Sequence, residues 1–170
     1  MGVNQRAQIT MTDAEVDALL DRSRTAVLGT VGRDGTPHLA AMWYAYLDGA
    51  LYVETKAKSQ KAVNLRRNPA CTVLVEAGDT YDQLRGVAID GRATIIDDNG
   101  SDEYWRAAVN VHERYTGEYD EAARPVVEMM MHKRVVVRID PLRTRSWDHR
   151  KLGLPALPLA GRTAATFRDP

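Results

Sequence analysis

Hairpin turns between strand-like runs limit the possible folds of this chain more than any other feature. The run "TAVLGTVG" is separated by "RDG" from "TPHLAAMWYAYLD", which "DG" separates in turn from "ALYVET". Runs rich in β-branched and aromatic residues, joined by short turns that contain Asp-Gly, are typical of antiparallel hairpins. We therefore expect an antiparallel meander over the segment from residue 25 to residue 55.

Three further strand-like runs follow, and helical patterns flank the strands. The runs are "ACTVLVEAG", "LRGVAIDGRATIID" and "KRVVVRIDP", and Gly91 in the second run indicates a bulge or a bend. Helices are expected to start at Thr12, at Ser59, at Ser101 and near Pro125. About six strands with helices at the margins predict a mainly β fold of the α+β class, a small closed or partly closed barrel rather than a doubly wound sheet.

The composition and charge exclude several classes of function. Lys plus Arg and Asp plus Glu both count 23, so the chain lacks the basic charge of a protein that grips nucleic acids. No apolar run reaches membrane-spanning length and the polar start "MGVNQRAQITMTD" has no signal-peptide core, so we expect a cytoplasmic protein without a membrane partner. The one cysteine, Cys71, fits a reducing compartment. One cysteine and four histidines without close ligand spacing predict no metal site.

Three lysines surround the expected start of a helix, where the backbone is already positive. Ser59 can cap this helix, and Lys56, Lys58 and Lys61 lie around its first turn. Because the positive end of a helix dipole favours acidic side chains, the lysines indicate a bound anion. Taken alone, they fit a solvated helix start equally well. The hydroxyl groups of Thr55 and Ser59 and the first-turn amides add phosphate ligands, and "AAMWYAY" offers flat side chains nearby, so the pattern predicts a flavin-like nucleotide site.

A family resemblance rests on several of these segments together. They are "PHLAAMWY", the "ET" that follows it, "SQKAVN" with "LRRNP", "RGVAIDGRA" and "IDPLRTRSW". From about Thr12 to Trp147 the chain resembles the split β-barrel flavin and deazaflavin oxidoreductases, the superfamily of pyridoxamine 5'-phosphate oxidase, and within it the actinobacterial group that uses coenzyme F420. The resemblance implies a six-stranded antiparallel split barrel of the FMN-binding type over residues 1–151, followed by an extended tail over residues 152–170.

The resemblance also implies which residues bind the cofactor. The backbone of one segment would line the flavin or deazaflavin ring: Leu39, Ala40, Ala41, Met42 and Trp43. A second group would hold the phosphate: Thr55, Lys58, Ser59, Gln60 and Lys61. Trp147 would reach the site across a dimer interface, so the resemblance implies a homodimer.

The chain departs from the oxidase pattern at three places. Gln60-Lys61 replaces an arginine-lysine pair, and Gly86 replaces a glutamine that reaches the flavin in the oxidases. After Trp147 the sequence reads "WDHRKLGLP" instead of carrying an arginine-x-histidine substrate motif. These departures argue against oxidation of vitamin B6 compounds.

The leading interpretation is a homodimeric F420-dependent reductase. It would transfer a hydride between the deazaflavin and an activated double bond of a small organic substrate. F420 carries carboxylates beyond its phosphate, and four residues offer an uncompensated positive surface to them: Lys56, Lys58, Arg66 and Arg67.

Two alternatives stay open on the sequence alone. One is an FMN-binding, oxidase-like flavoprotein, and the other is a cofactor-binding or carrier protein without turnover of its own. No catalytic residue is identified. Tyr44 and His38 are candidate proton donors, although strand alternation can equally turn either side chain away from the site.

Overall fold

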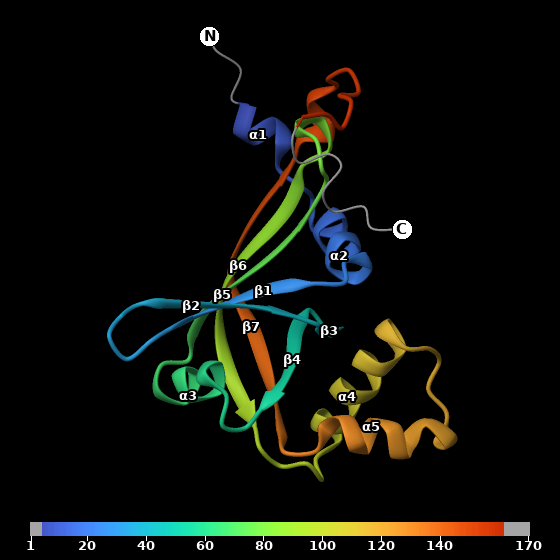
Figure 1. The fold of residues 1–170 in the computed structure, drawn as a ribbon. Helices are drawn as coiled ribbons and strands as arrows, with labels where there is room; N and C mark the ends of the chain where they lie inside the picture. Colours follow the sequence, from blue (N-terminus) through green and yellow to red (C-terminus); the bar gives the residue numbers. More distant parts are fainter. Residues whose placement is uncertain (1–4, 162–170) are drawn as a thin grey trace.

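One curled antiparallel sheet organises the chain, and the computed structural model describes it over residues 5–161 (Figure 1). The strands are β1 (Ala26–Val31), β2 (Pro37–Met42), β3 (Ala45–Leu47), β4 (Ala50–Lys56), β5 (Ala70–Ala77), β6 (Arg85–Ile96) and β7 (Arg134–Asp148). The α-helices are α1 (Gln5–Ile9), α2 (Asp13–Arg22), α3 (Gln60–Arg67), α4 (Asp102–Tyr115) and α5 (Arg124–Met131). None of these helices is long and apolar enough to cross a membrane.

The order of the strands requires the sheet to curl. The seven strands run β2-β1-β5-β6-β7-β4-β3, so β2 and β3 stand at opposite edges. Only Trp43 and Tyr44 separate the end of β2 from the start of β3. Because consecutive Cα atoms are only about 3.8 Å apart, the two edges must lie close together. The sheet therefore forms a split barrel that opens between β2 and β3.

The prediction of six strands is wrong by one, because the run "TPHLAAMWYAYLD" is not a single strand. It breaks at Trp43 and Tyr44. Before the break β2 pairs with β1, and after the break β3 pairs with β4. The backbone N–H of Tyr44 donates to the hydroxyl of Tyr115 in α4 (3.0 Å) instead of to a strand. The last strand is also longer than expected, since β7 continues through "PLRTRSWD".

The predicted turns, bulge and helix starts are confirmed. Asp48 and Gly49 have positive φ angles of 53° and 77° in the turn between β3 and β4, as a two-residue hairpin turn requires. The pairing of β6 with β7 shifts register between Asp90 and Gly91. Ser59 caps α3 by accepting a hydrogen bond from the backbone N–H of Ala62 (3.4 Å).

Two apolar cores hold the elements together, and β4 contributes to both. Leu51 and Val53 face the inside of the barrel, whereas Tyr52 faces the layer formed by α4 and α5. Because successive side chains of a strand point to opposite faces, a strand between two cores is buried on both sides. Every residue of β4 except the last is buried.

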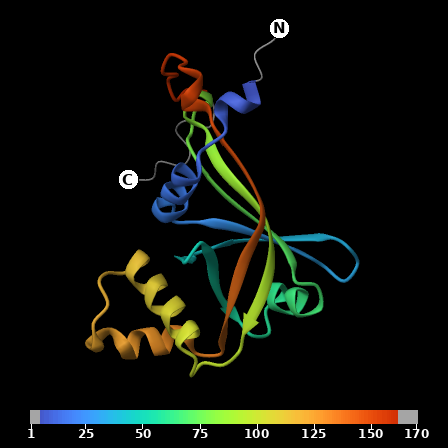
Figure 2. The ribbon, with the colours of Figure 1, turned by 180° about the vertical axis from the view of Figure 1, so that it is seen from behind.

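Strands β6 and β7 extend beyond the barrel as an arm (Figures 1 and 2). α1 and the 3₁₀ turn His149–Leu152 lie at the far end of this arm, while α3, α4 and α5 lie at the other end of the molecule. Beyond the turn, residues 153–160 form neither helix nor strand. The backbone N–H of Leu157 donates to Asp82 (3.3 Å), and residues 162–170 of the tail lie outside the described part.

Candidate cofactor site

The N-terminus of α3 presents hydrogen-bond donors from several sources. The hydroxyl groups of Thr55 and Ser59 lie 2.9 Å apart, so the end of β4 and the cap of α3 meet at this point. The backbone N–H groups of Gln60 and Lys61 belong to the first helical turn and have no partner within the helix. Such a group of donors suits an anion, because the helix dipole also favours negative charge here.

The lysines near this helix end are not equivalent. Lys56 donates to the backbone carbonyl of His132 (2.8 Å) and is therefore engaged within the fold. Over residues 5–161, the side chains of Lys58 and Lys61 form no hydrogen bond and no ion pair. Two of the predicted phosphate ligands thus carry a positive charge that no described side chain compensates.

The arginines at the other end of α3 correct one expectation. The guanidinium of Arg66 forms an ion pair with Asp97 at 2.7 Å and also donates to the carbonyl of Ala57. Arg67 donates to the carbonyl of Val31 at the end of β1. The expected uncompensated positive surface is therefore wrong for Arg66, whose charge is paired, because the turn after β6 brings an aspartate beside it.

A polar chain ties α3 to the barrel wall. Gln60 donates to the side-chain oxygen of Asn64 (2.8 Å), and the amide of Asn64 donates to the hydroxyl of Thr30 in β1 (3.1 Å). A pocket of about 330 Å³ lies here, lined by His38, Gln60 and Asn64 among others. Nδ1 of His38 is buried and has no partner among the described residues. The structure therefore brings His38 of β2 close to predicted phosphate ligands of α3.

The predicted ring-binding segment, Leu39–Trp43, lies at an open edge of the sheet. Among the described strands β2 pairs with β1 alone, so its other side offers backbone N–H and carbonyl groups that no described strand binds. Leu39 is 67% exposed and Trp43 is 51% exposed. The Trp43 ring stacks on Tyr115 with centroids 4.4 Å apart and planes 3° apart. An edge of this kind can contact a flat ring through its backbone.

Trp147 lies far from α3 in the same chain. It pairs with Gly86 of β6 near the end of β7. This end of β7 lies at the arm end of the molecule, away from α3 (Figures 1 and 2). A Cβ atom on Gly86 would lie 2.3 Å from Cζ2 of Trp147, so the indole ring occupies the space that a side chain would need. Neither Gly86 nor Trp147 carries a local sequence signal that predicts this packing.

Tyr44 is not available as a proton donor. Its ring is completely buried, and its hydroxyl donates to the carbonyl of Leu20 at 2.5 Å. Burial raises the pKa of Tyr44 to about 12, and the guanidinium of Arg114 over its ring offsets only part of this effect. Tyr44 therefore supports the core rather than the chemistry.

Glu54 is not among the predicted site residues. It is buried near the end of β4, and burial raises the pKa of its carboxyl to about 7. It lines a pocket of about 310 Å³ together with the predicted residues Ala41, Met42 and Trp43. The signal in the sequence is an acidic residue inside the otherwise apolar run "ALYVET", which has the pattern of a strand buried on both faces.

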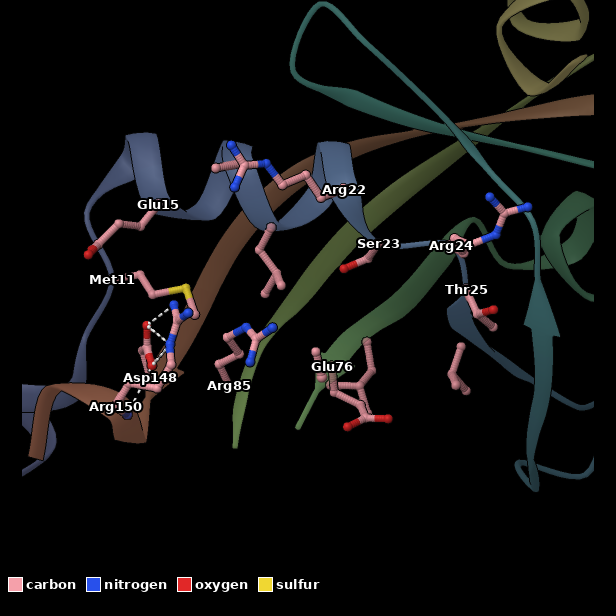
Figure 3. Close-up of a pocket in the computed structure, with 15 residues that line it drawn as sticks. Met11, Glu15, Arg22, Ser23, Arg24, Thr25, Glu76, Arg85, Asp148 and Arg150 are labelled. Atoms are coloured by element: carbon pink, nitrogen blue, oxygen red, sulfur yellow. Dashed lines mark hydrogen bonds and ion pairs between the residues drawn. The ribbon is translucent and has the colours of Figure 1, made fainter. Parts of the chain in front are cut away.

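A further groove contains none of the predicted site residues. It measures about 510 Å³ and lies between α2, the start of β1 and the arm (Figure 3). Three of its seven charged lining residues are in ion pairs: Arg150 contacts Asp148 at 2.6 Å, and Glu15 contacts Lys151 at 2.6 Å. The other four form no ion pair among the described residues: Arg22, Arg24, Glu76 and Arg85. Hydrogen bonds from Arg150 hold the pKa of Asp148 below its usual range. The predicted phosphate ligands of α3 and the open edge of β2 lie outside this groove.

The sequence matches the model of a protein family described as pyridoxamine 5'-phosphate oxidase, over residues 12–148. The chain belongs to this family. The pyridoxamine 5'-phosphate oxidase family binds flavin-type cofactors, and the predicted family resemblance is confirmed. No curated protein matches the chain.

Solved structures of related proteins agree with the split barrel. The conserved hypothetical protein Rv2991 from Mycobacterium tuberculosis is 55% identical, with 93% of this chain and 98% of that chain covered and a TM-score of 0.89. A protein named F420 reductase is 28% identical, with 75% and 94% covered and a TM-score of 0.58. An FAD-binding protein from Mesorhizobium loti is 21% identical, with 81% and 93% covered and a TM-score of 0.59, and it shows the fold alone.

Proposed function

We propose that this chain is a cytoplasmic, homodimeric F420-dependent reductase that acts on an activated double bond of a small organic substrate. The observation that carries the proposal is the pair of free cations, Lys58 and Lys61, beside the N-terminus of α3 in a family that binds flavin-type cofactors. The similarity to a protein named F420 reductase adds support. The residues present fit a phosphate group, since cations, hydroxyl groups and free amides converge there.

The side chains and backbone would bind and orient the cofactor. Lys58, Lys61 and the Ser59 hydroxyl would hold its phosphate, while the open edge of β2 would contact the ring. When bound and reduced, F420 supplies a hydride to the substrate. The stacked pair of Trp43 and Tyr115 would cover one side of the ring position and exclude water.

A second chain would complete the site. Trp147 lies at the arm end of the molecule, away from α3 of its own chain, so its predicted contact with the cofactor needs the arm of a partner. A two-fold dimer would build two equivalent sites in this way. Light scattering at micromolar concentration should give the mass of a dimer. A monomer that binds F420 at full affinity would contradict the shared site.

The activity is tested with reduced F420 and a panel of electron acceptors: enones, quinones, unsaturated lactams and tetrapyrroles. We expect at least one class to reoxidise F420, followed as recovery of the absorbance of the oxidised deazaflavin. Lys61→Ala at subsaturating cofactor should slow this reaction, and Lys56→Ala, whose ammonium is bound to His132, is the matched control. Tight binding of F420 without reoxidation by any acceptor would indicate a carrier instead, and FMN-dependent turnover would indicate an oxidase-like flavoprotein.

A further inference from the structure

A pocket on the outer face of the sheet contains the buried carboxyl group of Glu54. We call it the outer pocket. It lies between the β2–β3 junction, β4, α4, α5 and the start of β7, and its volume is about 310 Å³. Its main lining residues are Met42, Trp43, Glu54, Val111, Met130 and Arg134. Apart from Glu54 and Arg134, this wall is apolar.

The carboxyl group of Glu54 forms no hydrogen bond and no ion pair over residues 5–161, although the residue is only 8% exposed. Burial raises the pKa of this carboxyl, and the charge of Arg134 lowers it by less. Its neighbours on the same face of β4 are both satisfied: Tyr52 donates to Glu103 (3.0 Å), and Lys56 donates to the carbonyl of His132 (2.8 Å). Burying a carboxylate without a hydrogen bond is costly, so its persistence points to a group that it meets in the working protein.

Arg134 lies next to Glu54 on the same face without bonding to it. In the pairing of β4 with β7, Val136 is opposite Glu54 and Arg134 is opposite Lys56, so Arg134 is the diagonal neighbour of Glu54. The two charged groups form no ion pair, and Nε of Arg134 is buried without a hydrogen bond. An unused acceptor and an unused donor therefore flank the same apolar pocket.

The position of the outer pocket links it to the predicted cofactor. Ala41, Met42 and Trp43 belong both to its wall and to the segment predicted to line the ring. A molecule in the outer pocket would therefore lie beside that segment. The flat Trp43 ring, held in place by its stacking on Tyr115, favours a flat molecule.

We propose that the outer pocket binds the substrate, and that the substrate is a flat, neutral, α,β-unsaturated amide or lactam. Its N–H would donate to Glu54, its carbonyl oxygen would accept from Arg134, and its unsaturated body would contact Trp43 and the apolar wall. A ligand of this class satisfies both unpaired groups at once, which neither an amine nor a simple hydrocarbon does. That this ligand is a substrate rests on the proposed reductase function, whereas the binding itself does not.

The test uses cofactor-free full-length protein at pH 8 and two probes that differ by one methyl group. 2-Pyridone presents an N–H beside its carbonyl, and N-methyl-2-pyridone lacks the donor. Isothermal titration should give a dissociation constant for 2-pyridone at least tenfold lower than that for N-methyl-2-pyridone. In Glu54→Leu the preference should fall below twofold, whereas Glu113→Leu, at an exposed glutamate of α4, should keep it.

A second variant protects the test against a folding defect. Arg134→Gln should weaken both probes by a similar factor, because both use their carbonyl oxygen. Equal affinity for the two probes in the wild-type protein, or an unchanged preference in a folded Glu54→Leu variant, would overturn the assignment. Reoxidation of reduced F420 by other acceptors without any binding of 2-pyridone would leave the reductase proposal intact and remove this one. Binding of 2-pyridone by a protein with no affinity for F420 would leave this assignment intact and remove the reductase proposal.

Discussion

Removal of Lys61 tests the phosphate site with the least disturbance of the fold. The side chain has no hydrogen bond or ion pair within residues 5–161, so Lys61→Ala removes no described contact. Alanine also has the highest helix propensity, and position 61 lies in the first turn of α3. We therefore expect the free energy of unfolding to change by less than about 0.5 kcal/mol, the usual range for a surface substitution.

The expected effect on the cofactor is much larger. A hydrogen bond to a charged group contributes roughly 1.5 to 3 kcal/mol. Its loss should raise the dissociation constant of F420 by about tenfold to 150-fold, since each 1.4 kcal/mol is a factor of ten. Titration of the protein with oxidised F420, followed by the fluorescence of the deazaflavin, measures this constant directly.

Lys56→Ala distinguishes a direct contact with the phosphate from long-range electrostatic attraction. The ammonium of Lys56 is bound to the carbonyl of His132, so it contributes to F420 only as a nearby exposed charge. Such charges contribute about 0.2 to 1 kcal/mol, and salt screens them. Equal losses of affinity in Lys56→Ala and Lys61→Ala, both removed by added salt, would refute the direct contact of Lys61 with the phosphate.

Three further predictions concern packing and protonation. In Gly86→Ala the new methyl group must displace the ring of Trp147, so we expect a loss of about 1 to 3 kcal/mol in urea unfolding and a shift of tryptophan emission; an unchanged emission would contradict the packing. Tyr44→Phe removes one hydrogen bond to the buried carbonyl of Leu20, which keeps the guanidinium of Arg114 as a donor (3.1 Å), so stability should fall by about 0.5 to 1.5 kcal/mol, with F420 affinity retained. The pKa of Glu54, about 7 in the fold against an ordinary 4.5, means that the native state binds this proton more tightly than the unfolded chain. The free energy of unfolding should therefore fall as pH rises from 4.5 through 7. Glu54→Gln should lack this slope, and its free energy of unfolding should exceed that of the wild type by up to about 3 kcal/mol at pH 8. Parallel pH profiles of the two proteins would contradict the burial argument.

Local signals predicted the local structure of this chain well. The Asp48-Gly49 turn, the Ser59 cap and the shift at Gly91 each depend on a few consecutive residues, and all three are confirmed. These features follow from backbone conformation and capping, which neighbouring residues largely determine.

Features that depend on distant partners were predicted less well. The break at Tyr44 follows from the hydroxyl of Tyr115, which is 71 residues away in the sequence. The Trp147 ring has room because its neighbour on β6, Gly86, has no side chain. The Glu54 carboxyl lacks a hydrogen bond because α4, α5 and β7, which surround it, donate none. Alternation along one strand cannot reveal these relations, because each needs the register of a second element.

The affinity for F420 and FMN, measured side by side on the same cofactor-free protein, tests the central claim most directly. Both cofactors offer a phosphate to Lys61, so a difference in affinity reports on the ring and on the extra carboxylates of F420. Purified from a host that makes no F420, the protein should be colourless, should bind F420 more tightly than FMN, and should lose F420 affinity as salt is added. Stoichiometric FMN carried through purification, together with no measurable binding of F420, would contradict the account.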